Sequence, residues 1–266
     1  MSIALATLCI GEDYQARWDK YCSGNWRRYC DRHGYDLVIF REPLDTSPRA
    51  RARSPAWQKC LVLSELARYE RVIWVDSDVV IHPAAPAIHA DAPSDRIGAV
   101  ISGSYIAPEL RAPYLKRARA RTGPPGTEAE LWAADQISFY ARARVDPPSP
   151  PDIVQTGVMV LGRAHETLLT EIYQRDYPVD IFGHDQFPLS AEILSRRLLH
   201  RLDWRFNLVF PEYMVVHYPF LLLSPAPEVS ILMTLAISTA WDNSFFLHFA
   251  GRADLIPYIP SSFGSS

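Results

Sequence analysis

Short apolar segments alternate with segments of helical periodicity along the first third of the chain. The predicted elements, in chain order, are strand Ile3–Ile10, helix Gln15–Arg32, strand Asp36–Phe40, helix Ala56–Tyr69 and strand Arg71–Val75. His33-Gly34 supplies the stop of the first helix, and Ser54-Pro55 supplies the start of the second. Strands that alternate with helices form right-handed crossover units, so the pattern predicts an α/β fold with a mostly parallel central sheet and helices on both faces.

The rest of the chain is less regular. Its predicted elements are a short basic helix at Pro108–Arg121, a strand at Ile153–Leu161, helices at His165–Arg175 and Pro188–Leu199, and a strand or turn at Phe245–Phe249. Helix and strand breakers are frequent in residues 83–93 and 123–126. Because no internal repeat and no clean boundary interrupts the pattern, we expect residues 1–266 to form one domain.

The charge balance argues against a nucleic-acid binder. The 266 residues include 27 lysines and arginines against 30 acids, and a net charge of −3 gives no long-range field to hold a phosphate backbone. Hydrophobic residues make up 48% of the chain, which is enough for a sizeable core. We therefore expect a folded globular protein rather than a disordered one.

The cysteines and the longest apolar runs bear on the cellular compartment. The four cysteines are Cys9, Cys22, Cys30 and Cys60. They include no C-x-x-C pair, which favours reduced thiols in a cytosolic protein over a zinc ribbon or a disulfide scaffold. Met1–Ile10 lacks the basic start of a signal peptide, and Val229–Ala240 is shorter than the roughly 20 residues of a membrane-spanning helix. The expectation is a cytoplasmic protein without a transmembrane segment.

Two carboxylates follow the third predicted strand. Asp76 and Asp78 come directly after Arg71–Val75, and ligands of α/β sheets bind beyond the carboxyl ends of strands. Acids so close together repel each other unless a hard divalent cation such as Mn²⁺ or Mg²⁺ neutralises them, and such a cation would also hold a diphosphate. The alternative is a strand-ending turn that uses Asp, Ser and Asp as polar turn formers.

Four further motifs, in a fixed order, turn the acidic pair into a family resemblance. With the acidic pair included, the motifs are Trp57-x-Lys59, Trp74-Val-Asp-Ser-Asp78, Gln155-Thr-Gly157-Val-Met-Val-Leu161, His184-Asp185-Gln186 and His248-Phe-Ala-Gly251. The chain thereby resembles the GT-A glycosyltransferases, specifically the retaining groups that include glycogenin, the bacterial lipooligosaccharide α-galactosyltransferases, and the yeast mannan and plant xyloglucan transferases. The resemblance implies a Rossmann-like nucleotide-diphospho-sugar transferase fold with hexosyl- or pentosyltransferase activity.

The resemblance also implies a metal site with three protein ligands. Asp76 and Asp78 would meet the metal and the donor, with Ser77 between them at the donor, and His248 would be the third ligand. A neutral imidazole adds no negative charge beside a diphosphate, and Mn²⁺ accepts it as a ligand. Taken alone, His248 would be an ordinary half-buried histidine between two apolar neighbours.

The same resemblance assigns residues to the donor, a nucleotide-diphosphate sugar that we expect to be a UDP-sugar. Gly251 would let the backbone approach the diphosphate, and Arg252, near where related families carry a lysine, would grip the phosphate oxygens in a bidentate manner. Lys59 would reach the donor sugar and phosphates, unless it is a surface lysine at a helical turn. Thr7 and Tyr14 would lie at the nucleotide base, with Tyr14 stacked on it, unless that tyrosine packs in the core.

The Asp185-Gln186 pair decides the expected stereochemistry. In the retaining families the corresponding acid lies on the hydroxyls of the donor sugar, and the amide lies beside the anomeric carbon. Glutamine is a poor nucleophile, so Gln186 would act electrostatically, with its carbonyl oxygen facing the developing oxocarbenium in a front-face mechanism. Asp135-Gln136 precedes the Gln155-Thr-Gly157 strand, which is the wrong order, and is assigned to structure or acceptor contact.

Three alternatives stay open. An inverting GT-A transferase would use Asp185 as a general base. A haloacid-dehalogenase-like phosphatase also carries D-x-D after a strand, as Asp76 and Asp78 do, although it needs that loop near the N-terminus and a later acidic pair. A nonenzymatic sugar-nucleotide binding protein would keep the fold without turnover. The acceptor, whether glycan, lipid-linked sugar, small molecule or protein, has no readable code in the predicted loops at 102–126 and 213–227.

Overall fold

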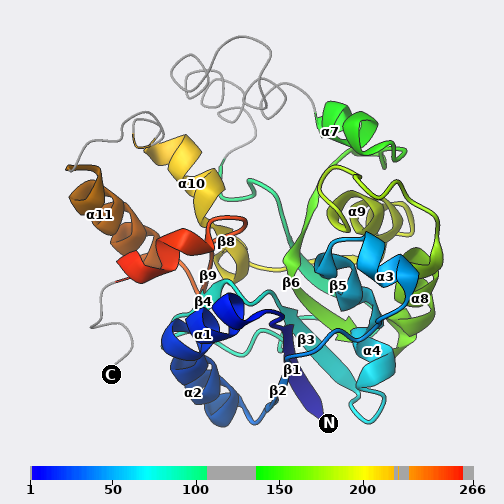
Figure 1. The fold of residues 1–266 in the computed structure, drawn as a ribbon, viewed down its shortest axis with the longest axis horizontal. Helices are drawn as coiled ribbons and strands as arrows, with labels where there is room; N and C mark the ends of the chain where they lie inside the picture. Colours follow the sequence, from blue (N-terminus) through cyan, green and yellow to red (C-terminus); the bar gives the residue numbers. More distant parts are fainter. Residues whose placement is uncertain (1, 107–135, 219–220, 222–227, 260–266) are drawn as a thin grey trace.

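A six-stranded sheet forms the centre of the computed structural model, which describes residues 2–106, 136–218, 221 and 228–259 (Figure 1). In the spatial order β2-β1-β3-β6-β5-β7, the strands are β2 (Asp36–Phe40), β1 (Ile3–Leu8), β3 (Arg71–Val75), β6 (Val154–Gly162), β5 (Ile97–Ile101) and β7 (Leu199–Arg201). All of them run in the same direction except β6, which is antiparallel to β3 and β5. The predicted α/β fold with a mostly parallel sheet is confirmed, whereas the predicted helix at 108–121 lies outside the described residues.

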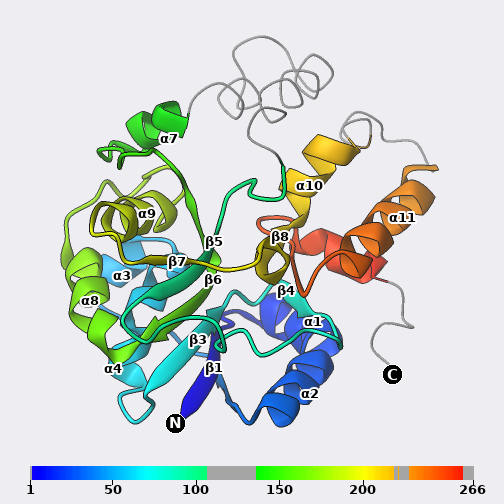
Figure 2. The same ribbon diagram turned by 180° about the vertical axis from the view of Figure 1, so that it is seen from behind.

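Helices cover both faces of this sheet, as the two opposite views show (Figures 1 and 2). On one face lie α1 (Glu12–Tyr21) and α2 (Ser23–His33), and on the other lie α8 (Glu166–Gln174) and α9 (Gln186–Ser195). The remaining helical segments are α3 (Pro48–Ala52), the 3₁₀-helix η1 (Pro55–Leu61), α4 (Val62–Glu65), α7 (Gln136–Ala143), η2 (Arg163–His165), η3 (Trp204–Asn207), α10 (Phe210–His217), α11 (Glu228–Asp242) and η5 (Ala253–Tyr258). Among the described helices, none has the length and apolar character that a membrane crossing requires.

The sheet separates two hydrophobic cores. Along β3, Ile73 and Val75 belong to the core that also contains Trp26 of α2. Val72 and Trp74, which alternate with them, belong to the core that α8 and α9 cover. Because side chains point alternately to the two faces of a strand and both faces are covered, β3 needs an uninterrupted apolar run.

A smaller sheet, in the order β4-β9-β8, adjoins the end of β3. Its strands are β4 (Val79–Ile81), β9 (Phe246–His248) and β8 (Leu208–Val209). Asp76-Ser77-Asp78 is the link between β3 and β4, so the acidic segment joins the two sheets. β9 pairs antiparallel with β4 and places His248 opposite Val79. The predicted late strand is confirmed, and its pairing brings His248 beside the acidic segment.

β6 carries a bulge where it passes the end of β3. Ala99 of β5 pairs with Met159, and the next residue of β5, Val100, pairs with Gln155. Residues 156–158 of β6 are thus the extra residues of the bulge. The Asp76 N–H donates to the carbonyl oxygen of residue 157 at 2.8 Å, so the bulge lies beside the acidic segment. Bulges next to active sites change the direction of side chains, and this one brings Gly157 against Asp76 and turns Thr156 toward Lys59 and Asp185.

The helix predicted at 15–32 is divided into α1 and α2 at Cys22. The Ser23 hydroxyl donates to the Asp19 carbonyl oxygen at 2.6 Å, and Gly24 follows it. Serine that bonds back to the backbone and glycine both disfavour a helix interior, which explains the break. The prediction of one continuous helix was therefore wrong.

The helix predicted at 56–69 is instead the 3₁₀-helix η1 followed by the short α4. The consecutive residues Trp57, Gln58, Lys59 and Cys60 are all buried. A regular amphipathic α-helix buries one face and exposes the other, so it could not bury four residues in a row. The tight winding of η1 brings both an indole and an ammonium group into the protein interior.

Candidate active site

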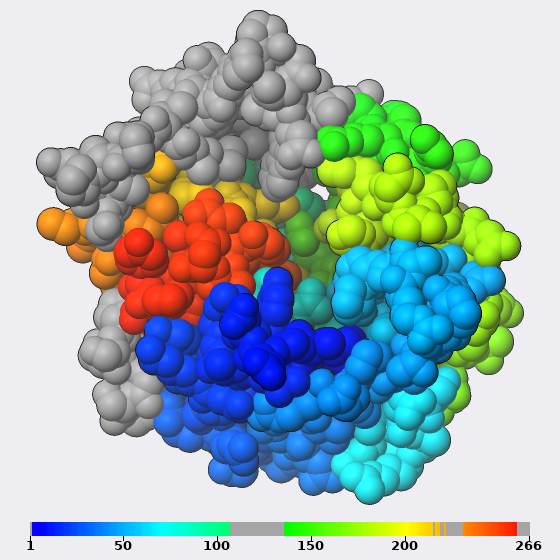
Figure 3. Space-filling view, in the orientation of Figure 1, coloured from blue at the N-terminus to red at the C-terminus, as the bar shows by residue number. Residues whose placement is uncertain are grey.

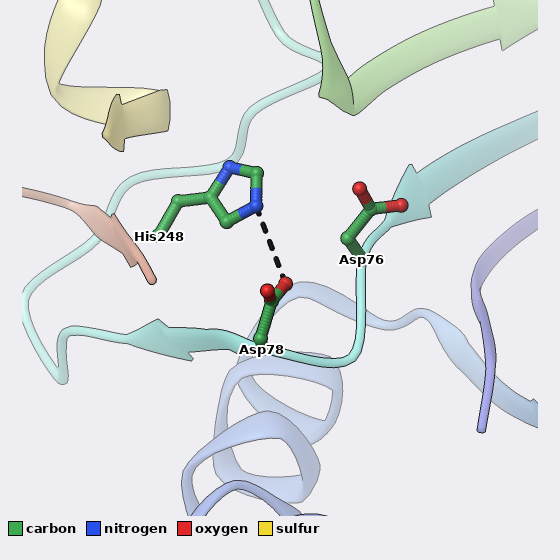
Figure 4. Close-up of side chains that lie close together, drawn as sticks. All are labelled: Asp76, Asp78 and His248. Atoms are coloured by element: carbon green, nitrogen blue, oxygen red, sulfur yellow. Dashed lines mark ion pairs between the residues drawn. The ribbon is translucent and has the colours of Figure 1, made fainter. Parts of the chain in front are cut away.

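The side chains of Asp76, Asp78 and His248 meet at the junction of the two sheets (Figure 4). One ligand atom from each lies within 4.8 Å of the others, and His248 Nε2 is 3.2 Å from Asp78 Oδ1. The imidazole is buried, whereas 30% of the Asp76 side chain and 20% of the Asp78 side chain are exposed. Ligand atoms about 2.1 Å from a cation and at right angles are about 3 Å apart. The His248–Asp78 distance matches this spacing, and Asp76 lies close enough to complete a three-residue candidate site for a divalent cation.

Asn207 of η3 orients the ring of His248. The Asn207 amide nitrogen donates to the Gln155 carbonyl oxygen at 3.3 Å, so Asn207 Oδ1 faces His248 Nδ1 at 2.9 Å. An amide oxygen only accepts, and Nδ1 therefore carries the ring proton. The lone pair of Nε2 then faces Asp78, and only a proton or a cation between the two atoms removes their repulsion. This hydrogen bond from the second ring nitrogen is typical of metal-binding histidines.

Gly157 of β6 makes room for the same ring. A Cβ on residue 157 would lie 2.2 Å from Cε1 and 2.8 Å from Nδ1 of His248, and 3.1 Å from Oδ2 of Asp76. Gly157 does not have a positive φ, so the glycine is required by space and not by backbone conformation. The glycine of the Gln155-Thr-Gly157 motif is thus explained by the close approach of two predicted metal ligands.

The charges in this group shift one another's pKa values. Burial alone would lower the pKa of His248, but the charge of Asp78 outweighs burial and raises it. Burial would raise the pKa of Asp78, and His248 lowers it instead. For Asp76, burial raises the pKa despite the attraction of Lys59. A proton shared by His248 and Asp78 therefore stabilises the group in the absence of a cation, and cation binding would displace it.

Lys59 is a buried ammonium group that joins two acids. Its Nζ lies 3.2 Å from Asp76 Oδ1 and 3.2 Å from Asp185 Oδ2, and it donates to the Thr156 carbonyl oxygen at 3.4 Å. The residue is 2% exposed, so the alternative of a surface lysine is wrong. Burial would lower the pKa of Lys59, but the charges of Asp185 and Asp76 outweigh burial and raise it. The positively charged Lys59 therefore links Asp76 of the candidate metal site to Asp185.

A turn with left-handed backbone places Asp185 and Gln186 at the start of α9. Gly183 and His184 have φ values of +70° and +52°, and the Gln186 N–H donates to the Gly183 carbonyl oxygen at 3.0 Å. Positive φ is uncommon for residues other than glycine, and such strain collects at functional sites. Asp185 is buried, and its Oδ2 also accepts from Thr156 Oγ1 at 3.0 Å. α9 begins at Gln186, earlier than predicted.

The amide of Gln186 is held in one orientation. Its Nε2 donates to the Val154 carbonyl oxygen at 3.3 Å and to Gln155 Oε1 at 3.2 Å. A carbonyl oxygen accepts only, so the NH₂ group faces Val154 and the amide oxygen faces away. Gln186 is half-buried, and its Oε1 has no hydrogen-bond partner within the described parts of the chain. Gln186 Oε1, which the family resemblance places beside the anomeric carbon, is thus available to face a donor sugar.

The residues predicted at the nucleotide lie near the end of β1 and the acidic link. Thr7 is fully buried, and its hydroxyl oxygen has no partner among the described residues. Tyr14 of α1 is 53% exposed, so the alternative of a tyrosine packed in the core is wrong. Its ring lies 5.5 Å from the Arg17 guanidinium. The carbonyl oxygen of Ser77 accepts from the Cys22 thiol at 3.8 Å, which anchors the link to α1 and α2.

The segment after β9 carries the last two predicted donor residues. Gly251 has a φ of +67°, and a Cβ there would meet nothing within 4 Å, so the glycine serves the backbone conformation. Arg252 forms a two-point ion pair with Asp254, with both N···O distances at 3.0 Å, and its side chain is 41% exposed. A phosphate would have to replace Asp254 as its partner. Figure 3 shows that this face is hollowed between the N-terminal residues (blue), the C-terminal residues (red) and the residues near 50 (light blue).

Three consecutive residues of β6 each position one part of the site. The Gln155 carbonyl oxygen holds Asn207, the Thr156 hydroxyl and carbonyl hold Asp185 and Lys59, and Gly157 admits the His248 ring. The sequence motif indicated that this strand belongs to the site, but the positioning roles depend on the bulge and were missed. Asn207 was missed as well, because no motif surrounds it.

Comparisons with known proteins support the fold. No family model matches the sequence, and no curated protein sequence matches it. A glycosyltransferase involved in the glycosylation of the major capsid of PBCV-1 aligns with 96% of this chain and 100% of its own, at a TM-score of 0.51 and 14% identity. The apo structure of the bifunctional glycosyltransferase WbbM aligns with 98% of this chain and 50% of its own, at a TM-score of 0.53 and 13% identity.

The likeness at these identities is one of fold. The mixed sheet with a single antiparallel strand, β6, and the nearly full-length alignments establish the GT-A glycosyltransferase fold that the motifs predicted. Within that fold the chain places an Asp-Asp-His group beyond the carboxyl end of β3. This chain spans about half the length of WbbM.

Proposed function

We propose that residues 1–266 form one metal-dependent glycosyltransferase domain. It transfers a hexosyl or pentosyl group from a nucleotide-diphosphate sugar, a UDP-sugar, to a glycan, lipid-linked sugar, small molecule or protein acceptor. The observation that carries the proposal is the convergence of Asp76, Asp78 and His248 beyond the end of β3 in a GT-A fold. Asn207 and Gly157 hold that group in a geometry that a turn-forming role for the acids would not need.

The ligands and the donor contacts follow from this placement. Mn²⁺ or Mg²⁺ held by Asp76, Asp78 and His248 would neutralise the diphosphate and stabilise it as a leaving group. In the same proposal Ser77 and Gly251 lie against the diphosphate, and Arg252 exchanges Asp254 for phosphate oxygens. The nucleotide base lies at the end of β1, near Thr7, with exposed Tyr14 stacked on it. Lys59 places a fixed positive charge between the metal-binding group and the sugar.

The proposed transfer retains the configuration of the anomeric carbon. The bond from C1 to the diphosphate breaks, the acceptor oxygen bonds to C1 on the same face, and the acceptor proton passes to the departing phosphate oxygen. Gln186 directs its Oε1 toward the developing positive charge, and Asp185 binds sugar hydroxyls. The fixed orientation of the Gln186 amide supports this role.

The three alternatives have less support. Asp185 Oδ2 already accepts from Thr156 and pairs with Lys59, which favours a fixed sugar-binding carboxylate over the base of an inverting enzyme. Asp76 Oδ1 accepts from Trp74 Nε1 at 2.7 Å and pairs with Lys59, which hinders the nucleophilic attack of a phosphatase. A nonenzymatic binder would share the site, so turnover has to distinguish it.

Nucleotide release is the decisive experiment. A panel of UDP-, GDP- and ADP-sugars is incubated with the protein in Mn²⁺ and in EDTA, and the free nucleotide is measured. We expect UDP release from one UDP-sugar in Mn²⁺ only, together with a UDP-dependent rise of the melting temperature that also requires Mn²⁺. A binder would show the temperature shift without release. Release that persists in EDTA would remove the metal from the proposal.

A further inference from the structure

A chain of hydrogen bonds runs from Glu212 of α10 to Gln186. Glu212 is 5% exposed, and its Oε1 accepts from Ser102 Oγ at 2.6 Å and from Gln155 Nε2 at 2.7 Å. Gln155 is 8% exposed, and its Oε1 accepts from Gln186 Nε2 at 3.2 Å. Burying a carboxylate costs free energy unless hydrogen bonds hold it, so the position of these donors matters to the fold as well. Neither Glu212 nor the Gln155 side chain belongs to the metal or donor set.

The Glu212 carboxyl group sets the direction of both amides. Its Oε1 accepts from Ser102 and Gln155, so Gln155 presents its Nε2 to Glu212 and its Oε1 to Gln186. Gln186 presents its Nε2 to that oxygen, and the Val154 carbonyl requires the same orientation. Aligned dipoles in a region of low dielectric strengthen one another. The negative end of the chain of dipoles is Gln186 Oε1.

Without Gln155 the Gln186 amide would keep its orientation through the Val154 carbonyl and lose its second acceptor, so its preference for this orientation would weaken. A glutamine amide rotates about its last bond, and the flipped form would turn its NH₂ group toward the position of the sugar. In that form Gln186 Oε1 would face the Val154 carbonyl oxygen and Gln155 Oε1, two acceptors that repel it. Substitution of Gln155 removes one of the two acceptors of Gln186 Nε2. Replacement of the Glu212 carboxyl group by an amide would allow the Gln155 amide to turn over.

We propose that Gln155 and Glu212 are positioning residues of the transferase, which hold the Gln186 carbonyl oxygen toward the anomeric carbon of the donor sugar. The inference rests on the proposed function for what Gln186 does, but the orientation of its amide is a property of the protein alone. Both residues act through Gln186. An oriented dipole matters most when charge develops, so they affect kcat more than donor KM.

Two substitutions test the hydrogen bond between Gln155 and Glu212. The first breaks it, and the second restores it with donor and acceptor exchanged. Gln155→Glu opposes two carboxylates and should lower kcat about 10- to 100-fold, less than the loss of a catalytic dipole itself, with donor KM changed by no more than about twofold. In the double variant with Glu212→Gln, the amide at position 212 donates to the carboxylate at position 155, which still accepts from Gln186. We expect that variant to recover kcat to within about threefold of the wild type.

Two controls separate positioning from a structural role. In a Gln186→Ala background, Gln155→Glu should have no further effect on kcat, because the residue through which it acts is gone. Glu192→Gln removes an acid from the same helix, α9, where it pairs with Arg175 and Arg196 at the surface, and should leave kcat unchanged. A fall in kcat that persists in the Gln186→Ala background would overturn the proposal.

An activity-independent measurement tests the orientation directly. In the protein without metal or donor, the side-chain NH₂ protons of Gln186 are followed by ¹⁵N–¹H NMR. We expect slow exchange with water in the wild type and in the double variant, and exchange at least about tenfold faster in Gln155→Ala, since its acceptor is lost. If Gln155→Ala does not fold, Gln155→Asn, whose shorter side chain cannot span from Glu212 to Gln186, replaces it.

The NMR measurement and the nucleotide-release assay can contradict the positioning and the proposed function independently of each other. Protected Gln186 protons in a protein that releases no nucleotide from any donor would confirm the positioning and refute the proposed function. Exchange that is equally fast in the wild type and in Gln155→Ala would refute the positioning, whatever the activity.

Discussion

His248 lies against Gly157 so closely that a Cβ on residue 157 would be 2.2 Å from the ring carbon Cε1. The ring is also held by Asn207 Oδ1, 2.9 Å from its Nδ1, and its Nε2 faces Asp78 at 3.2 Å. The imidazole therefore has one position in which all three neighbours are satisfied. The geometry of the candidate metal site depends on a residue that has no side chain.

Gly157→Ala should separate metal binding from folding. The added methyl group forces the His248 ring away from Asp76 and Asp78, and overpacking of this kind costs about 1–3 kcal/mol, which most domains tolerate. We expect Mn²⁺ affinity, measured by electron paramagnetic resonance, to fall at least about tenfold while the circular dichroism spectrum is unchanged. Gly24→Ala is the matched control, because a Cβ there meets only Arg28 Nη1 at 3.6 Å. An unchanged Mn²⁺ affinity in Gly157→Ala would contradict the assignment of His248.

Substitutions of Asp76 and Asp78 should change the free energy of unfolding by different amounts but have the same effect on function. Asp76→Asn and Asp78→Asn each remove a predicted ligand, so both should lose Mn²⁺ binding and nucleotide release. Asp76→Asn also leaves buried Lys59 with Asp185 as its one paired acid among the described residues, and we expect about 1–2 kcal/mol of destabilisation, reduced because Asp76 is 30% exposed. Asp78→Asn should change the free energy of unfolding by less than about 1 kcal/mol. Urea unfolding measures the difference, and full activity of either variant would exclude that residue as a ligand.

Mn²⁺ affinity should fall as the pH falls, through His248. Asp78 raises the pKa of this imidazole above its ordinary 6.5 in the metal-free protein, so below that raised value a cation has to displace a proton from Nε2. Affinity should then fall about tenfold per pH unit, and it should level off above the raised pKa. In the metal-free protein the free energy of unfolding depends on pH in the opposite direction from Mn²⁺ affinity. The His248–Asp78 pair stabilises the fold below the ordinary pKa of histidine and loses this contribution as the pH rises through the raised pKa.

Calorimetric titration of Mn²⁺ in two buffers of different ionisation enthalpy counts the released protons. We expect about one proton per cation near pH 6 for the wild type and fewer for His248→Ala, whose affinity should also be lower. Equal affinity and equal proton release in the two proteins would leave His248 as a structural histidine.

The strands that carry the site could be predicted because each is a buried run next to a chemical signal. β3 precedes the acidic pair, β6 contains Gln155-Thr-Gly157, and β9 contains His248. β5 at Ile97–Ile101 was missed, since an apolar run of five residues beside a breaker-rich stretch carries no periodicity of its own. Helix boundaries failed where a side chain competes with the helix, as at Ser23, or where tertiary contacts bury every side of a segment, as in η1.

Motif order pointed to Asp76, Asp78 and His248 as one candidate metal site, whereas the residues that hold these three side chains could not be predicted from the sequence. Asn207, Thr156 and Glu212 act through hydrogen bonds between segments far apart in the chain, and no local pattern marks them. The β6 bulge, which places Gly157 beside Asp76, depends on the register between two strands. Register is set by packing of the whole sheet and is not visible in either strand alone.

The cysteines should be inert in the folded protein. Burial raises the pKa of the thiols of Cys9, Cys22, Cys30 and Cys60, that of Cys30 to about 12, and all four are free and buried. The thiolate is the reactive form, so a disulfide reagent at pH 8 should modify none of them within minutes, and four after unfolding in guanidinium. Rapid modification of the native protein would show an opening of the N-terminal helices or of η1.

Substitutions of Gln186 and Asp185 should affect kcat and donor KM differently. Losing one preorganised dipole beside developing charge costs about 10²- to 10³-fold in rate, so Gln186→Ala should be slow with little change in donor KM. Asp185→Ala should lower kcat and raise donor KM, because its carboxylate would bind sugar hydroxyls in both ground and transition states. Asp185→Asn, which can still accept from Thr156, serves as the control for the local fold.

The anomeric configuration of the product decides between the two chemistries in which these residues would act. With an α-linked donor, NMR of the glycoside formed should show an α product, since Gln186 Oε1, which faces away from its Val154 and Gln155 partners, favours attack on the face that the diphosphate leaves. A β product would require a base that takes the acceptor proton on the opposite face. It would move Asp185 to that role and make Gln186 a structural residue. The kinetic split provides the independent check: in an inverting enzyme Asp185→Ala should lose kcat nearly completely, while Gln186→Ala should remain close to the wild type.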